Sequence, residues 1–343
     1  MRVFASTDDH LPLDRVADHA RRVEALGYDG MHVSETVHDA FLAALLALQA
    51  TRRIVVRTSV VVAFPRSPMV TALAGWDLAR MSGGRFSLGL GTQVRGNIEG
   101  RYATSWSDPV GRMQEYLESL RAIFASFQTG EPLAFEGEHY RFTRLQPFFN
   151  PGPHDHPDVP ILVGGVGSGM CRLAGRVADG LVTHPTSALP AVLDRIRHDV
   201  RAGEEAAGRA PGSTVVVTST QLVTGRDEQV IAANREERRR MLGFLYSTPA
   251  YRSALELIGL GDRADRLTSM SRDGDWSRLG EALDDDVLDA VAPSATYDRV
   301  ADLLLSRYAG AEELVLALPD DPADDQAWAE VVSSVRGSGP HLP

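Results

Sequence analysis

The hydrophobic positions of this chain fall into two alternating patterns along its length. Short, continuous apolar runs predict buried strands, whereas apolar residues spaced three and four apart predict helices with one buried face. The predicted strands are residues 3–7, 31–34, 54–64, 86–90, 160–164, 180–184, 214–223 and 313–318. The helical spacing is clearest in the segment after the first strand, on Leu13, Val16, Ala17, Ala20, Val23 and Leu26.

Helical segments separate the eight predicted strands. Parallel strands need such crossover connections, and eight strand–helix units close a (β/α)8 TIM barrel. We therefore predict an α/β protein with a single barrel domain over residues 1–320. Residues 129–159 are predicted to be an ordered excursion, and residues 226–292 a helical cap between the seventh and eighth strands. Residues 321–343 are predicted to form an acidic and then flexible C-terminal tail.

The composition narrows the class of protein. Of the 343 residues, 43% are hydrophobic, which is enough for the core of a barrel of this size. The net charge of −11 argues against nucleic acid as a partner, because neutralising phosphates needs clustered Lys and Arg. The single cysteine, Cys171, allows no internal disulfide, and no long apolar run marks a signal peptide or a membrane span. We expect a cytoplasmic enzyme that acts on a small molecule and has no membrane partner.

The most informative local pattern is residues 82–92, Ser-Gly-Gly-Arg-Phe-Ser-Leu-Gly-Leu-Gly-Thr. A helix stops at the glycine pair, a short apolar strand follows, and Gly89 and Gly91 leave its carboxyl end bare. Glycines there let a flat ligand lie against the backbone, and α/β enzymes build their sites at this end of their strands. The same pattern also fits a tight connection followed by a thinly packed strand.

Several motifs, in this order, resemble the luciferase-like monooxygenase superfamily. They are Gly27-Tyr28-Asp29-Gly30 into Val33-Ser34-Glu35, the 82–92 segment, Gly164-Gly165-Val166, and Leu173-Ala174-Gly175 through Ala178-Asp179-Gly180. Within that superfamily the chain is most similar to actinobacterial F420-dependent oxidoreductases, over residues 2–320. The resemblance implies a cofactor with an isoalloxazine-like ring at the top of the barrel. Coenzyme F420 is the expected cofactor and FMN the alternative, because both kinds of enzyme share this scaffold.

The resemblance also implies which residues surround the cofactor. Ser59–Val60 falls where the family has a non-prolyl cis peptide beneath the ring. The same sequence is also compatible with an ordinary third strand. Gly164, Gly165 and Val166 fall in the loop that receives the cofactor phosphate. Glycines before a helix let backbone amides converge on an anion, although a flexible turn is also glycine-rich. The expected cofactor contacts are completed by Ser34, Gly91, Thr92 and His184.

Candidate acids and bases stand at the ends of the first two predicted strands. Asp8 and Glu35 should open into the pocket, where a carboxylate can orient a substrate or relay a proton. Glu35 could equally form a salt bridge. Thr36 and Gln93 stand where sugar-phosphate-oxidising relatives have a histidine and a glutamate, the pair that oxidises a hydroxyl. Because this histidine and glutamate are missing, reduction of a C=C or C=N bond by reduced F420 is favoured. His38 could take the place of the missing histidine.

Other residues keep two interpretations. Tyr246, Tyr251 and Arg252 could wall the substrate pocket or belong to the core of the cap, and His184 could contact a ligand or simply pack beside a proline turn. The arginines at 235, 238, 239 and 240 could bind the polyglutamate tail of F420 or an acidic substrate, or could form a solvated helix face. The histidines at 154 and 156 lack further ligands, so no metal site is expected.

The expected function is that of an F420-dependent reductase acting on a small molecule or natural product. One alternative is an FMNH2-dependent luciferase-like monooxygenase, which would need oxygen and a partner flavin reductase. A second is a protein that binds a flavin or deazaflavin without turnover. A homodimer formed through outer helices is also implied by the resemblance.

Overall fold

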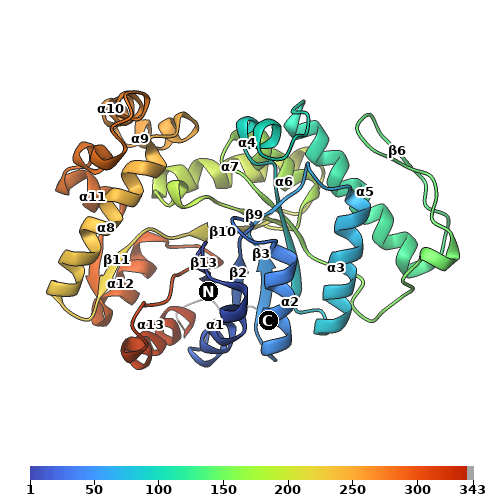
Figure 1. The fold of residues 1–343 in the computed structure, drawn as a ribbon, viewed down its shortest axis with the longest axis horizontal. Coiled ribbons are helices and arrows are strands. Elements are labelled where there is room, and N and C mark those ends of the chain that lie inside the picture. Colours follow the sequence, from blue (N-terminus) through green and yellow to red (C-terminus); the bar gives the residue numbers. More distant parts are fainter. Residues whose placement is uncertain (338–343) are drawn as a thin grey trace. The chain divides into compact units, whose positions relative to one another are not determined.

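The computed structural model describes residues 1–337, and its fold is the predicted (β/α)8 TIM barrel (Figure 1). Contacts divide the chain into two compact units. The N-terminal unit comprises Phe4–Val182 and Asp199–Val216, and the C-terminal unit comprises Met1–Val3, Thr183–His198 and the chain from Val217 onward. Each unit is described by itself below.

The N-terminal unit is built on parallel strands. β1 pairs with β2, β2 with β3, β3 with β5, β5 with β8 and β8 with β9, while β4 also pairs with β5. Their bounds are β1 (Arg2–Ser6), β2 (Gly30–Val33), β3 (Val55–Thr58), β4 (Val61–Val62), β5 (Phe86–Gly91), β8 (Ile161–Gly164) and β9 (Gly180–Val182). All residues of β2 and β5 are buried, and these strands lack an alternating pattern because both of their faces are covered, although each includes one polar residue, His32 or Ser87.

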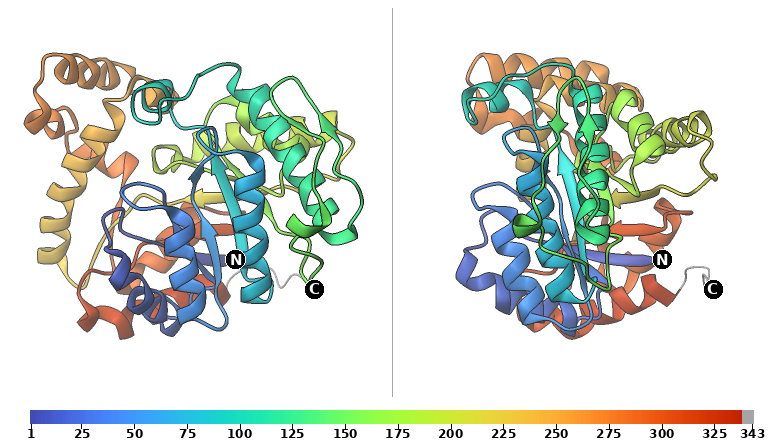
Figure 2. Two further views of the ribbon diagram at one scale, coloured as in Figure 1. Left: turned by 45° about the vertical axis from the view of Figure 1, so that its right-hand side comes forward. Right: turned by 90° about the vertical axis from the view of Figure 1, so that its right-hand side faces the viewer.

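Helices follow these strands and cover them. Figure 2 shows α1, α2 and α3 next to one another beside the blue and cyan strands. The helices are α1 (Leu13–Ala25), α2 (Ala40–Ala50), α3 (Pro68–Ser82), α4 (Arg95–Gly100), α5 (Pro109–Thr129) and α6 (Ser168–Val177), with α7 (Pro190–Ala206) contributing to both units. α3 begins at the N-cap Ser67 and ends at Gly83, whose φ of 66° is left-handed, as the glycine pair predicted.

The excursion at 129–159 contains short regular elements. It contains an antiparallel hairpin of β6 (Phe135–Glu136) and β7 (Arg141–Phe142) and a 3-10 turn, η1 (Pro147–Phe149). Two side-chain hydrogen bonds join its second half to the helices: Trp76 Nε1 donates to Gly152 O at 3.0 Å, and Asn150 Nδ2 donates to Ser126 O at 3.0 Å.

The C-terminal unit holds the remaining strands and a helical group. β10 (Val215–Ser219), which begins in the N-terminal unit, pairs in parallel with β13 (Glu313–Val315), and β11 (Val223–Gly225) pairs with β12 (Ser294–Thr296). The helices are α8 (Glu228–Tyr246), α9 (Arg252–Glu256), α10 (Gly261–Arg272), α11 (Asp285–Val291), α12 (Tyr297–Arg307) and α13 (Asp325–Gly337). Its 3-10 turns are η2 (Pro185–Ser187), η3 (Pro249–Tyr251), η4 (Trp276–Ala282) and η5 (Pro322–Asp324).

Three sequence expectations change in the structure. The strand predicted over 54–64 is interrupted at residues 59–60 and becomes β3 and β4. The strand predicted over 214–223 ends at Ser219, and the chain enters β11 only at Val223. The tail predicted from 321 forms helix α13, which is anchored by buried apolar side chains, and residues 338–343 lie outside the described part; the anchors are Trp328, Val331, Val332 and Val335.

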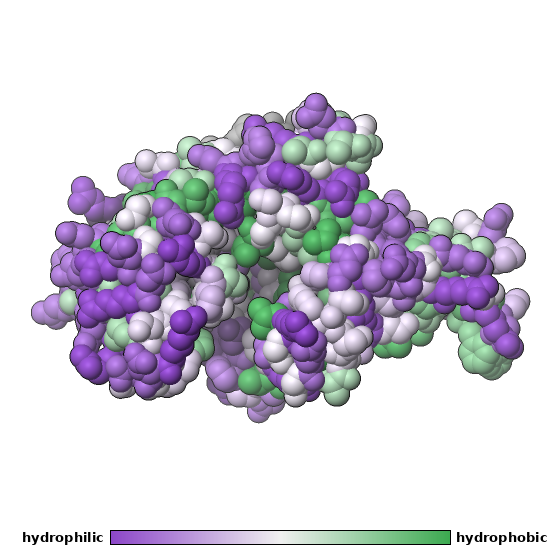
Figure 3. All heavy atoms as spheres, turned by 90° about the horizontal axis from the view of Figure 1, so that it is seen from above, coloured by the Kyte–Doolittle hydropathy of each residue, from purple (hydrophilic) through white to green (hydrophobic). Residues whose placement is uncertain are grey.

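The surface is mainly polar on the face drawn in Figure 3, where hydrophilic residues predominate and hydrophobic ones are interspersed. This agrees with a chain in which 24% of residues are charged. Within residues 1–337, no helix combines the length and apolar character needed to cross a membrane.

Candidate active site

Glycines at the carboxyl end of β5 make room for the neighbouring backbone. A Cβ on Gly89 would lie 2.0 Å from Thr58 O, and a Cβ on Gly91 would lie 2.4 Å from Val60 Cγ2. The Thr58 hydroxyl also donates to Gly89 O at 2.9 Å and accepts from Gly89 N at 2.8 Å. The space expected to lie bare above β5 is therefore filled by the bend between β3 and β4, so a ligand there would rest on Val60.

The bend itself has the geometry that the resemblance implied, since the peptide bond between Ser59 and Val60 is cis. Both residues are half-buried. The side chain of Val60 is also approached from β8, because a Cβ on Gly164 would lie 3.1 Å from Val60 Cγ1. Val60 therefore stands between Gly91 and Gly164, at the carboxyl ends of two parallel strands.

The loop between β8 and α6 presents backbone amides. Gly165 N donates to Val182 O at 3.2 Å, which fixes the start of the loop to β9. α6 begins after the N-cap Gly167, which offers no side-chain cap to the first turn. A Cβ on Gly167 would meet nothing within 4 Å, so the space before the helix is open. Uncapped N–H groups and the helix dipole favour an anion at this place, and the loop therefore fits a phosphate group.

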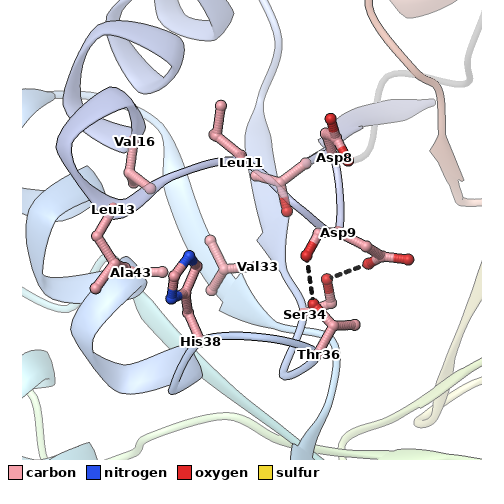
Figure 4. Close-up of a pocket in the computed structure, with 11 residues that line it drawn as sticks. Asp8, Asp9, Leu11, Leu13, Val16, Val33, Ser34, Thr36, His38 and Ala43 are labelled. Carbon is pink, nitrogen blue, oxygen red and sulfur yellow. Dashed lines mark hydrogen bonds between the residues drawn. The ribbon is translucent and has the colours of Figure 1, made fainter.

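A hollow that opens to solvent lies beside the ends of β1 and β2 (Figure 4). It is lined by Thr7, Asp8, Asp9, Leu11, Leu13, Val16, Val33, Ser34, Thr36, His38 and Ala43. In Figure 4 the His38 ring lies on the apolar side of the hollow near Ala43, whereas Asp8 lies on the far side. The hollow brings together Asp8, Ser34, Thr36 and His38, all of which the sequence singled out.

Hydrogen bonds in this hollow centre on Asp9 rather than Asp8. Ser34 Oγ donates to Asp9 Oδ1 at 2.6 Å, and Thr36 Oγ1 donates to Asp9 O at 2.6 Å. The Asp8 carboxylate is exposed and accepts from His10 N at 2.9 Å. Ser34 and Thr36 thus tie the loops after β1 and β2 together, and the residues Asp8 and Asp9 both remain exposed to solvent.

Glu35 lies in a salt bridge, which is the alternative that its position allowed. Its carboxylate accepts from both terminal nitrogens of Arg66, at 2.5 and 2.9 Å, and from Val62 N at 2.7 Å. Its side chain is only 7% exposed. Arg66 also donates to Asp39 Oδ2 at 2.8 Å, and these hydrogen bonds raise the pKa of Arg66 against the lowering effect of burial. Glu35 therefore holds the β4 backbone in place.

Thr92 and Gln93 organise the start of α4. Gln93 has a left-handed φ of 59°, and its Oε1 accepts from Val94 N at 3.2 Å and from Asn97 Nδ2 at 3.0 Å. Thr92 Oγ1 donates to Gln93 O at 3.0 Å. These contacts use both side chains within their own loop, so neither stands ready to exchange a proton with a substrate.

The remaining candidates lie in the C-terminal unit, three of them around Thr186. The ring of His184 stacks on Tyr251 with centroids 4.5 Å apart, and its Nδ1 accepts from Thr186 N at 3.2 Å. Tyr246 donates its hydroxyl hydrogen to Thr186 O at 3.1 Å, and burial raises its pKa, so it stays protonated. Arg252 instead pairs with Asp265 at 2.8 Å and with Glu256 at 2.9 Å.

The histidines of the excursion have a packing role. The ring centroids of His154 and Trp76 are 4.0 Å apart, and His154 Nδ1 accepts from His156 N at 3.0 Å. Among residues 1–337, no three His, Cys, Asp or Glu side chains are grouped as a metal ion would require.

Sequence reasoning missed two residues that shape this region. Arg66, which binds Glu35 and Asp39, is not among the candidates that the sequence indicates. Asp9, the acceptor for Ser34, stands next to the residue that was favoured. An arginine that lies between the end of a strand and the next helix is a usable sequence signal for Arg66. No sequence signal separates Asp8 from Asp9.

The sequence is similar to a known protein family and to individual proteins. The sequence profile of the family described as luciferase-like monooxygenase matches residues 1–312. An uncharacterized protein of Mycobacterium tuberculosis (strain H37Rv) is 38% identical over 306 residues, covering 89% of this chain and 90% of that protein. The 5,10-methylenetetrahydromethanopterin reductase of Archaeoglobus fulgidus is 26% identical over 316 residues, 89% of each chain.

The fold is also similar to that of a solved enzyme. The structure of coenzyme F420 dependent tetrahydromethanopterin reductase from Methanopyrus kandleri superposes with a TM-score of 0.79 and covers 98% of both chains at 19% identity. At that level of identity, the similarity shows the shared barrel fold.

Proposed function

This chain belongs to the luciferase-like monooxygenase family, and from that premise we propose that it is a coenzyme F420-dependent oxidoreductase. In its sharper form, the protein is a reductase that acts on a C=C or C=N bond of a small molecule. The similarity to a named reductase over 89% of both chains supports this form. Bound F420H2 would supply the hydride, and the protein would position both reactants.

One observation carries reduction over alcohol oxidation. Thr36 donates to the Asp9 carbonyl oxygen in the loop after β1, and Gln93 bonds within its own loop, so these two positions hold no acid–base pair. Removing hydride from an alcohol also needs a base for its proton, whereas reducing an unsaturated bond needs only a modest proton donor. Asp8 and His38, in the hollow of Figure 4, are the proposed groups for orienting a substrate and donating this proton.

The surface around Val60 and the neighbouring loop before α6 together fit a flat ring that carries a phosphate. Val60, between Gly91 and Gly164, would support one face of the ring. The amides before α6, with Gly165 and Val166, would hold the phosphate. Ser34 and His184 are proposed as further contacts of the cofactor, and Tyr251 and Arg252 as parts of the substrate-binding side, whereas Tyr246, which is 1% exposed, belongs to the core of the cap. Glu35 would act only as a positioning residue, through Arg66 and Val62.

The test is a titration of the apoprotein with F420 and, separately, with FMN, followed by fluorescence quenching. Tight F420 binding with weak FMN binding supports the proposal and is followed by a screen of unsaturated substrates under F420H2. The reverse preference points to an FMNH2-dependent monooxygenase. Binding of F420 without hydride exchange with any substrate points to a binding protein, and absence of binding to either cofactor overturns the proposal.

We also propose that the protein is cytoplasmic and forms a homodimer. Apolar side chains stand exposed on the adjacent helices α2 and α3, namely Leu42, Val70, Leu73 and Met81. Such a patch is often covered by a partner surface. Light scattering coupled to size-exclusion chromatography gives the mass directly, and a monomer at all concentrations contradicts the dimer.

A further inference from the structure

Four arginines lie close together on α8, the long yellow helix of Figure 1, and three of them have ordinary partners. Arg235 pairs with Asp289 and Asp285, and Arg239 pairs with Asp285 and Glu236. Arg240 is exposed and donates to the Glu236 carbonyl oxygen at 3.2 Å. Arg240 matches the solvated helix face that the sequence allowed, whereas Arg235 and Arg239 are half-buried and bind α8 to the acidic residues of α11.

Arg238 differs from its neighbours. Its Nη1 donates to Gln221 Oε1 at 3.1 Å and lies 4.0 Å from the sulfur of Met241. Throughout residues 1–337, no carboxylate oxygen comes within 4.0 Å of its guanidinium nitrogens. The carboxylates of Glu237 and Asp320 act on it only over longer distances, and burial lowers the pKa of Arg238 despite their attraction. The guanidinium is thus a half-buried cation that no carboxylate of the described residues contacts.

The partner of Arg238 adds to this excess of hydrogen-bond donors. Gln221 is only 1% exposed, its Oε1 is taken by Arg238, and its Nε2 has no acceptor anywhere in residues 1–337. Gln221 follows β10 by two residues, and its backbone N donates to the Tyr308 hydroxyl at 3.3 Å. It therefore stands at the carboxyl end of a barrel strand, the end at which such barrels bind their ligands.

We propose that Arg238 and Gln221 form a binding site for an oxyanion, either the carboxylate or the phosphate of a substrate. A buried charge is costly unless an opposite charge meets it, and the guanidinium fork matches both of these groups in geometry. The amide hydrogens of Gln221 add a neutral donor beside the fork. The binding of an oxyanion rests on these contacts alone, whereas its assignment to the substrate rests on the proposed function.

The first experiment measures thermal unfolding of the wild-type protein, Arg238→Met and Arg240→Met at constant ionic strength, with inorganic phosphate replacing chloride. We expect a saturable rise of the midpoint in wild type and Arg240→Met, and a smaller rise in Arg238→Met, which keeps only the response of the amides before α6. Without phosphate, Arg238→Met should be close to wild type in stability, because the removal of an unpaired charge offsets the loss of the hydrogen bond to Gln221 Oε1. Equal phosphate responses in all three proteins, or none in any, overturn the site. A marked loss of stability in Arg238→Met without phosphate also overturns it, since Arg238 is then structural.

The second experiment separates the two possible sources of the oxyanion. F420 is titrated into wild type and Arg238→Met with fluorescence detection. Equal affinities assign the oxyanion to the substrate, as proposed, whereas a tenfold or greater loss in Arg238→Met assigns it to the cofactor and overturns that part of the proposal. If neither protein binds F420, the proposed function fails, while the phosphate response still decides whether the Arg238 site exists.

Discussion

Glu35 shows how a well-placed acid at a strand end can serve structure rather than chemistry. We expect Glu35→Gln to lower the free energy of unfolding by about 1–3 kcal/mol, because Arg66 loses its main counter-ion. Asp39→Asn should cost less, because the Asp39 side chain is 39% exposed and only shares Arg66. Urea unfolding measures both. If Glu35→Gln instead lost turnover while its stability was unchanged, Glu35 would have a catalytic role.

Gly167 allows a matched test of the loop before α6. Aspartate and serine are both good N-cap residues, and the structure leaves open space for either side chain. We expect Gly167→Ser and Gly167→Asp to unfold at or above the wild-type temperature. Only Gly167→Asp should weaken F420 binding, by about tenfold or more, because its carboxylate repels a phosphate. Equal affinities in the two variants would show that the phosphate binds elsewhere.

Single residues were the least predictable level of this protein. The sequence identified Glu35 as a charged group at a strand end, but its partner Arg66 is 31 residues away and only the fold brings them together. The space above Gly91 was interpreted as open because a sequence does not show that Val60 occupies it. Residue type predicts what chemistry a side chain can do, and packing decides whether it is available.

At the scale of elements, Glu115 on α5 holds the turn of the β6–β7 hairpin. Its carboxylate accepts from the backbone N of Glu138 at 2.9 Å, of His139 at 2.7 Å and of Tyr140 at 3.1 Å. Desolvation alone would raise the pKa of Glu115, but these hydrogen bonds outweigh it and lower the pKa from its usual 4.5. The charged form is therefore the one that binds the hairpin.

The lowered pKa fixes the sign of the pH dependence. The folded state releases the Glu115 proton more readily than the unfolded state, so its contribution is fully present above about pH 4.5 and is lost as the pH falls further. We expect Glu115→Gln to speed amide hydrogen exchange at residues 138–140 at neutral pH. Glu118→Gln, one turn later on α5, serves as the control. Unchanged exchange in Glu115→Gln would mean that other contacts hold the turn.

Most elements could be predicted because their apolar spacing reflects burial, and the errors have physical causes. The apolar run 54–64 stays buried through a bend, so periodicity cannot reveal the break at Ser59–Val60. The run 214–223 likewise continues through a short connection into β11. Helix α13 differs from the predicted tail because the acidic residues at its start do not prevent its apolar face, which includes Trp328, from being buried.

At the scale of the whole molecule, the alternation of strands and helices was enough to predict the barrel. The two compact units and the pairing of β11 with β12 could not be predicted, because both depend on contacts between distant segments. The identity of the substrate could not be predicted from the sequence for the same reason. The excursion and the cap lack the repeating pattern of the barrel, and their side chains are placed only by the fold.

Stability of the whole fold should depend on His32, which lies within the core on β2. His32 is only 5% exposed and its Nε2 faces Arg57 Nη1 at 3.2 Å. Burial, and then the charge of Arg57, lower the pKa of His32 well below 6.5, so the folded protein keeps this ring neutral. In the unfolded chain the His32 ring binds a proton near pH 6.5, whereas in the folded chain it stays neutral at this pH. Stability is therefore lost as the pH falls below that value, by up to about 1.4 kcal/mol per pH unit.

The corresponding measurement is urea unfolding at about pH 7.5 and about pH 5.5 for wild type, His32→Gln and His10→Gln. The wild type and His10→Gln, whose ring is exposed, should both lose stability at the lower pH. His32→Gln should lose less between the two pH values, whatever its stability at neutral pH, because glutamine does not titrate. His19, whose pKa burial also lowers, would leave part of the pH dependence in place. An identical loss in all three proteins would mean that His32 is not the group through which acid unfolds the barrel.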